Sequence, residues 1–144
     1  EEDSRVKTLI TLASVSDFKA RFPSGQLLKQ WKEQGVMFVE NGRTKQQMPH
    51  YFQYFEDFES NEKRLTIKRA VSNLKIPHLI IHGNDDTSVS VEEAKALQKW
   101  NPNSILKIIK GANHVFGTSH PWGKDTLSKD LQNAVDVSIT FLKN

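Results

Sequence analysis

The sequence has no cysteine among its 144 residues. This excludes disulfides, a thiol nucleophile and cysteine-ligated zinc or iron–sulfur sites, and it fits a reducing compartment such as the cytoplasm. No apolar run approaches the roughly 20 residues of a membrane helix, so we expect no membrane segment. Twenty Lys and Arg stand against 17 Asp and Glu, which is well short of the clustered positive charge of nucleic-acid-binding proteins.

The apolar residues predict an α/β fold with three mostly parallel strands and flanking helices. Short apolar runs bounded by breaking residues predict buried strands at 6–13, 78–82 and 105–109. Helical periodicity predicts helices at 91–100 and at about 126–142. Strand and helix alternate, which is typical of a sheet with right-handed crossovers.

Local signals mark where these two helices begin and end. Ser90 followed by Glu93 predicts a capping box at the start of the helix over 91–100. Asn101-Pro102 predicts its end. In the last helix, apolar residues recur every four positions, at Leu127, Leu131, Val135 and Ile139, with Leu142 after them.

The stretch from Ser16 to Leu74 is too long for a plain crossover, which needs about a dozen residues. It predicts a short helix ended by Gly35, a hairpin that turns at Asn41-Gly42, and a helical segment reaching Leu74. The aromatic residues from Tyr51 to Phe58 are interpreted as packing inside this insertion rather than as an acyl pocket. An insertion at the carboxyl end of a strand lies where open α/β sheets bind ligands.

These observations predict three parts. Residues 1–15 form a core strand, residues 16–74 form an insertion, and residues 75–144 form a core that carries two polar loops. Lys63-Arg64 and Lys68-Arg69 are interpreted as a solvated helix face.

Chemistry-bearing residues follow two of the predicted strands. Asp85 and Asp86 come after the strand over 78–82, and His114 comes after the strand over 105–109. Adjacent parallel strands place such loops side by side. A carboxylate beside an imidazole is the orienting half of a nucleophile–His–acid triad.

The segments that carry these residues resemble the C-terminal half of an α/β-hydrolase. The first reads HGxxDxxV from His82 to Val89, and the second reads GAxHxFG from Gly111 to Gly117. The resemblance implies a partial α/β-hydrolase fold, with Asp86 as the catalytic acid, His114 as the catalytic histidine, and 16–74 as a cap. It implies hydrolysis of a small-molecule ester, thioester or peptide, with no cofactor and no metal.

One part of the family pattern is missing from this sequence. The nucleophile elbow G-x-S-x-G occurs nowhere, and the family's order of triad residues places it upstream of Glu1. Ser14, Ser16 and Ser24 lack the strand–turn–helix context of an elbow. We therefore expect this chain alone to be inactive. Its expected partner is the missing N-terminal half, or a second copy that pairs with the open edge of the strand over 6–13.

Alternatives remain open from the sequence. The chain is a non-catalytic binding module on a hydrolase-like scaffold, one chain of a two-chain hydrolase, or an enzyme with an aspartate nucleophile of the haloalkane-dehalogenase type. Asp86 also suits a turn, with Asp85 as a competing acid, and His114 also suits a structural loop position. His82 is interpreted as structural, and a metal site built from these four residues matches no standard spacing.

Overall fold

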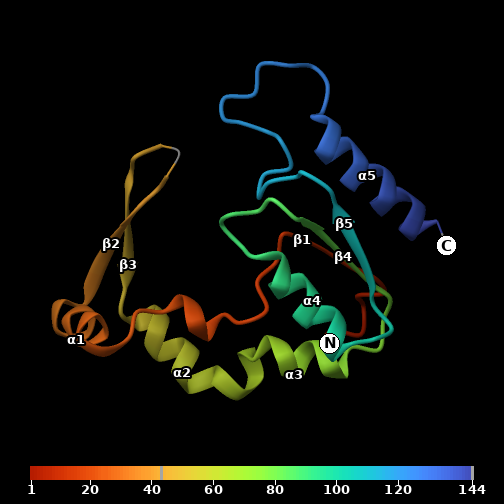
Figure 1. Ribbon diagram of the computed structural model, residues 1–144. Coiled ribbons are helices and arrows are strands. Elements are labelled where there is room, and N and C mark those ends of the chain that lie inside the picture. Colours follow the sequence, from red (N-terminus) through yellow and green to blue (C-terminus); the bar gives the residue numbers. More distant parts are fainter. Residues whose placement is uncertain (43, 144) are drawn as a thin grey trace. The chain divides into compact units, whose positions relative to one another are not determined.

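The computed structural model describes residues 1–42 and 44–143. The chain divides into two compact units, of which unit 1 comprises Glu1–Ser16 and Lys68–Asn144, and unit 2 comprises Asp17–Ile67. The elements, labelled in Figure 1, are β1 (Leu9–Leu12), η1 (Lys19–Arg21), α1 (Gly25–Gln34), β2 (Val36–Glu40), β3 (Gln47–Tyr51), α2 (Gln53–Leu65), α3 (Ile67–Asn73), β4 (His78–Gly83), α4 (Val91–Trp100), β5 (Ile105–Ile109) and α5 (Lys129–Leu142).

Unit 1 is built on a parallel three-stranded sheet with the strand order β1-β4-β5. This confirms the predicted α/β alternation. Every residue of the central strand β4 is buried, and Leu79, Ile80 and Ile81 are at most 1% exposed. Complete burial of such side chains contributes about 1.5–3 kcal/mol each, so β4 is the main hydrophobic anchor of the unit.

Strand β1 is shorter than the predicted strand over 6–13. The N–H of Val6 donates to the Asp3 carbonyl at 3.2 Å, which closes a turn where extended backbone was expected. Ala13 has a φ of 47° and ends the strand in the left-handed region. The apolar run was therefore a correct indication of a strand, but its outer residues belong to the flanking turns.

Helix α4 has its predicted bounds, but its predicted capping box was partly wrong. The Ser90 hydroxyl accepts the N–H of Glu92 at 3.3 Å, one residue before the position that a capping box uses. The Glu93 carboxylate accepts the N–H of Ser16 at 2.6 Å and its hydroxyl at 2.5 Å. Glu93 therefore ties the segment after β1 to α4, a long-range contact that local sequence does not reveal.

Helix α5 begins at Lys129, three residues later than expected, because the Ser128 hydroxyl caps it by accepting the N–H of Leu131. Its most buried residue is Ala134, which is fully covered, with Val137 and Phe141 packed against the same core. The four-residue stripe that predicted the helix includes exposed residues such as Ile139. The small side chain of Ala134 lets the helix approach the sheet, so the buried face of α5 is the one with Ala134, Val137 and Phe141 rather than the predicted four-residue stripe.

Unit 2 is held together by aromatic side chains. Trp31 is 2% exposed and packs with Phe52 and Phe55, and its indole N–H donates to the His50 carbonyl at 2.8 Å. Phe58 is also buried, whereas Tyr51 and Tyr54 are exposed. Most of the aromatic segment therefore packs as core, as interpreted from the sequence.

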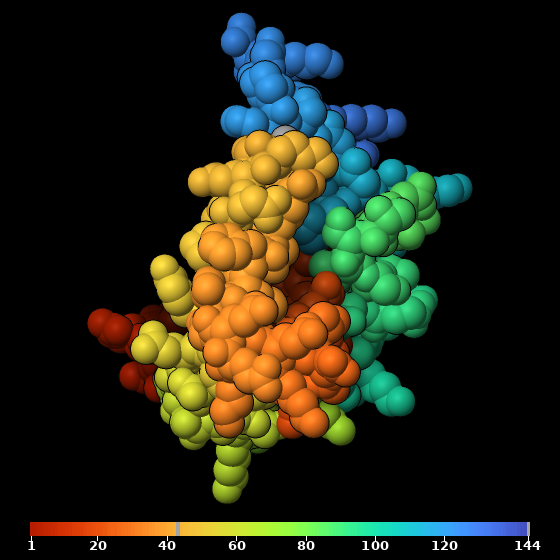
Figure 2. Space-filling view, turned by 90° about the vertical axis from the view of Figure 1, so that its left-hand side faces the viewer, coloured from red at the N-terminus to blue at the C-terminus, as the bar shows by residue number. Residues whose placement is uncertain are grey.

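The predicted hairpin is present, but its predicted turn was wrong. Strands β2 and β3 pair from Val36↔Tyr51 to Glu40↔Gln47, so the loop is longer than the two residues Asn41-Gly42. Positive φ occurs at Lys45, and the N–H of Asn41 donates to the Gln46 carbonyl at 2.8 Å. Arg43, which the predicted hairpin included, lies outside the described residues. Figure 2 shows this hairpin and α1 as a continuous orange and yellow surface.

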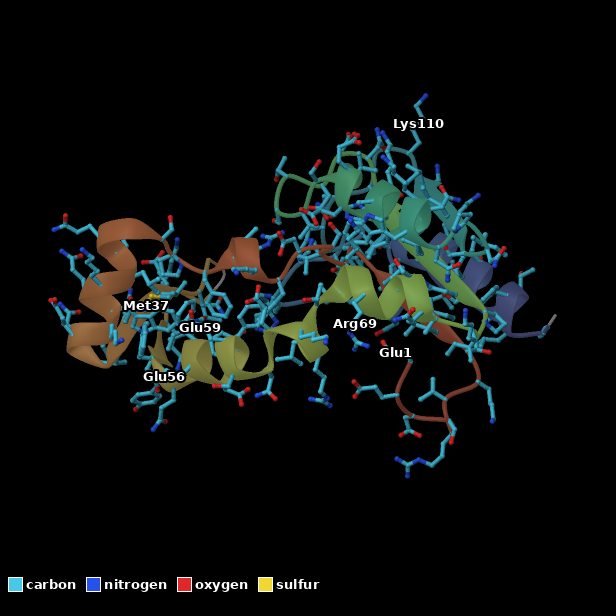
Figure 3. The ribbon with its side chains drawn as sticks, turned by 90° about the horizontal axis from the view of Figure 1, so that it is seen from below. Glu1, Met37, Glu56, Glu59, Arg69 and Lys110 are labelled. Atoms are coloured by element: carbon cyan, nitrogen blue, oxygen red, sulfur yellow. The ribbon has the colours of Figure 1, made fainter. Side chains whose placement is uncertain are left out.

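One of the basic pairs is more than a solvated face. Arg69 donates to the Glu1 carboxylate at 2.6 Å, and the two side chains lie next to one another in Figure 3. Arg69 therefore holds the start of the chain against α3 within unit 1. Among the described residues, no helix is long and apolar enough to cross a membrane.

Candidate active site

Asp86 lies in the loop that leaves β4, and its side chain is completely buried. Its Oδ1 accepts the N–H groups of Ser88 and Val89, each at 2.8 Å. An aspartate that accepts amides two and three residues ahead fixes its own loop as a turn. The turn interpretation and the acid interpretation of Asp86 are therefore compatible. The turn uses Oδ1, and Oδ2 remains available to contact His114.

Asp86 Oδ2 lies 2.8 Å from Nδ1 of His114, in the loop that leaves β5. Burial alone raises the pKa of Asp86, but the hydrogen bonds from the Val89 amide, the His114 ring and the Ser88 amide outweigh it and lower the pKa below its usual value. The carboxylate is thus ionised and only accepts, so Nδ1 of His114 carries the hydrogen. In the neutral ring, Nε2 is then left with a lone pair.

The His114 side chain is 42% exposed, in contrast to the buried acid beside it. Within the described residues, the His114 ring has one hydrogen bond, the one to Asp86. The arrangement is chemically a base with a fixed tautomer and a buried counter-charge. Its exposed side allows Nε2 to accept a proton from another group.

The two loops meet because β4 and β5 are adjacent and parallel, with Gly83 opposite Ile109. A Cβ on Gly83 would lie 2.1 Å from the carbonyl oxygen of Ala112, so only glycine permits this approach. The N–H of Asp85 donates to that same carbonyl at 3.1 Å. Asp85 itself is exposed and spans the loops through its backbone, which leaves Asp86 as the carboxylate that contacts His114.

Two asparagines that the sequence analysis did not single out hold these loops. The Asn84 side-chain oxygen accepts the N–H of Gly111 at 2.6 Å, which joins the acid loop to the histidine loop. The Asn113 side-chain oxygen accepts the N–H groups of Val115 at 3.2 Å and Gly117 at 2.9 Å. The available signal was their position, since Asn84 follows a glycine and Asn113 precedes the candidate histidine. An asparagine amide oxygen at such a place can accept backbone N–H groups of a turn.

Backbone strain lies next to His114. Phe116 is buried and has a φ of 51°, which a bulky residue rarely adopts. The Ser128 hydroxyl donates to the Phe116 carbonyl through a short contact, so the cap of α5 also fixes the histidine loop. Strain of this kind persists only where the surroundings hold it, and it concentrates at functional sites.

The other candidate residues have contacts or positions of their own. Ser16 bonds to Glu93, and Ser24 precedes α1 in unit 2. His82 is fully buried beneath Asp86, with its Nε2 3.8 Å from Oδ2. In residues 1–42 and 44–143, no group of three or more histidine, aspartate or glutamate side chains is arranged to hold a metal ion.

Comparison with known proteins gives matches in structure alone. No protein-family model matches this sequence, and a search of curated proteins found no match. A monoacylglycerol lipase of Paleococcus ferrophilus is 13% identical, with a TM-score of 0.61 over 96% of this chain and 60% of the lipase.

Two further structures match at similar identity. An esterase domain from Rhodothermus marinus is 15% identical, with a TM-score of 0.51 over 79% of this chain and 45% of the domain. An α/β-hydrolase from the metagenome of Mar Chica lagoon sediments is 15% identical, with a TM-score of 0.52 over 96% of this chain and 52% of the enzyme. The chain thus spans about half the length of the structures it matches, and it has part of the α/β-hydrolase fold, as its sequence predicted.

Proposed function

We propose that Asp86 and His114 are the acid and the general base of a serine hydrolase that acts on a small-molecule ester, a thioester or a peptide. One observation carries this proposal, the 2.8 Å contact between a buried carboxylate and a half-exposed imidazole at the ends of adjacent parallel strands. Hydrolases among the structural matches support the scaffold for such chemistry.

The proposed mechanism gives each residue one task. Nε2 of His114 takes the proton of a nucleophilic hydroxyl as that oxygen attacks the substrate carbonyl, and it then gives the proton to the leaving group. A water molecule next gives a proton to His114 as its oxygen attacks the acyl-enzyme. His114 then returns that proton to the nucleophile oxygen, which restores the hydroxyl and releases the carboxylic acid product. Asp86 holds Nδ1–H throughout and stabilises the imidazolium.

The nucleophile is the part of this mechanism that the described residues do not supply. No described serine or threonine bonds to His114. We propose that the hydroxyl comes from a segment that pairs with the free edge of β1, either in the same longer protein or in a partner chain. In either case the acid–histidine pair belongs to this chain and the activity to the assembly.

The isolated chain is therefore predicted to lack triad-dependent turnover. The measurement is hydrolysis of p-nitrophenyl acetate by the purified chain, compared with its His114→Ala variant. We expect the two rates to be equal, at the level of scattered surface groups. An esterase rate that falls tenfold or more in His114→Ala would show that a nucleophile lies within this chain.

The proposal itself is tested on the protein in its native source. Antibodies against this chain would isolate it, intact mass would give its true length, and a fluorophosphonate would label an activated serine. We expect a labelled assembly that contains a serine elbow, with labelling lost in His114→Ala and kept in Asp85→Asn. An assembly that takes no label, or one whose labelling survives His114→Ala, would leave the chain as a binding module.

A further inference from the structure

His82 occupies the penultimate position of β4, and the proposed mechanism gives this titratable side chain no task. Its side chain is 0% exposed. Its Nδ1 lies 2.9 Å from the carbonyl oxygen of Gly83. A carbonyl oxygen can only accept, so this contact is favourable when Nδ1 carries the hydrogen.

The other ring nitrogen of His82 has no hydrogen-bond partner in the part of the chain that the structure describes. Its nearest acidic oxygen is Asp86 Oδ2, at 3.8 Å, which lies beyond hydrogen-bond distance. Buried polar atoms are nearly always satisfied, so an orphaned nitrogen at this place needs an explanation.

The surroundings of Asp86 supply that explanation. Oδ1 is occupied by the amides of Ser88 and Val89, and Oδ2 is occupied by Nδ1 of His114. Nε2 of His82 lies 3.8 Å from Oδ2, so a hydrogen on this nitrogen would be attracted to the oxygen that His114 contacts. A neutral ring with its hydrogen on Nδ1 offers no such competitor.

We propose that His82 is a positioning residue, locked by the Gly83 carbonyl as the neutral Nδ1–H tautomer, which fills the space behind Asp86 without donating to Oδ2. The carboxylate oxygen is thereby left to His114 alone. The catalytic value of this arrangement rests on the proposed function, since it is His114 that would act as the base. The tautomer and the undivided Oδ2 contact do not depend on turnover.

The first test reads the tautomer directly in the full chain. Long-range nitrogen–hydrogen NMR correlations at neutral pH distinguish a ring nitrogen that carries a hydrogen from one that does not. We expect His82 to show a protonated Nδ1 and a bare Nε2. A hydrogen on Nε2, alone or together with one on Nδ1, would overturn the proposal.

The second test compares substitutions that differ in their capacity to donate. His82→Phe fills the space without a donor, and His82→Gln introduces an amide that can reach Oδ2. The readout is the hydrogen-bonded Nδ1–H proton signal of His114. We expect the phenylalanine variant to keep this signal and the glutamine variant to lose it or to exchange it at least threefold faster.

The control is His78→Phe, since His78 is a buried histidine four residues earlier on the same face of β4. It measures the effect of exchanging a buried imidazole for a phenyl ring in the same strand, and amide spectra report whether each variant folds. An unchanged His114 signal in His82→Gln, or its loss in a folded His82→Phe, contradicts the proposal. Neither result bears on fluorophosphonate labelling, so the two hypotheses fail separately.

Discussion

His78 shows how a single buried side chain makes the fold depend on pH. Its Nε2 lies 3.1 Å from the Thr11 hydroxyl, and its Nδ1 has no partner among the described residues. Burial lowers the pKa of His78 below its usual value. Below about pH 6.5, His78 is therefore protonated more readily in the unfolded chain than in the folded chain. The free energy of unfolding is expected to fall as the pH falls.

His78→Gln is expected to flatten this dependence, because glutamine does not titrate and its amide can still bond to Thr11. The measurement is urea unfolding between pH 7 and pH 5. His120→Gln, a change at an exposed histidine, serves as the control and is expected to keep the wild-type slope. An identical slope in His78→Gln would assign the acid sensitivity to other groups.

Asp86→Asn is expected to disable the proposed base while leaving the loop in place. The asparagine oxygen can still accept the Ser88 and Val89 amides, but its NH₂ would face His114 and drive the ring hydrogen to Nε2. In well-studied triads the same exchange costs about 10⁴ in rate. Fluorophosphonate labelling of the native assembly measures this. A variant that labels within tenfold of wild type would contradict the assigned role.

The residues of the site were predictable to the extent that their partners are close in sequence or follow adjacent strands. Asp86 and His114 each follow an apolar strand, and parallel pairing brings such positions together. The bonds of Asn84 and Glu93 were not predictable in this way, because each reaches a backbone amide on a distant segment. The neighbouring residues indicate local roles, a turn for Asn84 and a capping box for Glu93, and not these distant partners.

At the scale of elements, Gly83 links the sheet to the site. Gly83→Ala places a methyl group 2.1 Å from a backbone oxygen, so the two loops must separate. Forced overpacking of this kind costs about 1–3 kcal/mol. Urea unfolding is expected to show that loss, and the Asp86–His114 proton signal is expected to weaken with it.

Gly123→Ala provides the matched control, since a Cβ at Gly123 meets nothing within 4 Å. We expect its stability to lie within about 0.5 kcal/mol of wild type. Equal stability of the two alanine variants would show that the approach of the loops is not tight in solution.

The elements themselves followed from periodicity, and the errors lie at their ends. Strands β4 and β5 and helix α4 were predicted nearly residue for residue, because breakers such as Pro77, Pro102 and Gly111 bound them. The hairpin turn was misplaced because Asn41-Gly42 is a local signal, whereas strand pairing and the packing of Met37 on the aromatic core set the register. Pairing across strands overrides a favourable turn dipeptide.

At the scale of the whole molecule, β1 has an edge that pairs with no other strand in the described part of the chain. β1 stands at one end of the sheet order, and the N–H groups of Leu9 and Ala13 donate to carbonyls on the side of β4. Since successive N–H groups alternate, those of Ile10 and Leu12 point to the open side. An apolar strand with an unpaired edge is a template for pairing with another chain.

The isolated chain is therefore expected to self-associate in a concentration-dependent way, as measured by light scattering. Leu12→Pro removes an N–H from the free edge without touching the bonds to β4, and it is expected to reduce the associated fraction at least threefold. Ile139→Lys, a change at an exposed apolar residue of α5, is the control and is expected to leave association unchanged.

A monodisperse wild-type monomer would show that this edge is already protected. Equal association of Leu12→Pro and wild type would place the contact elsewhere, and a drop in Ile139→Lys would assign it to α5.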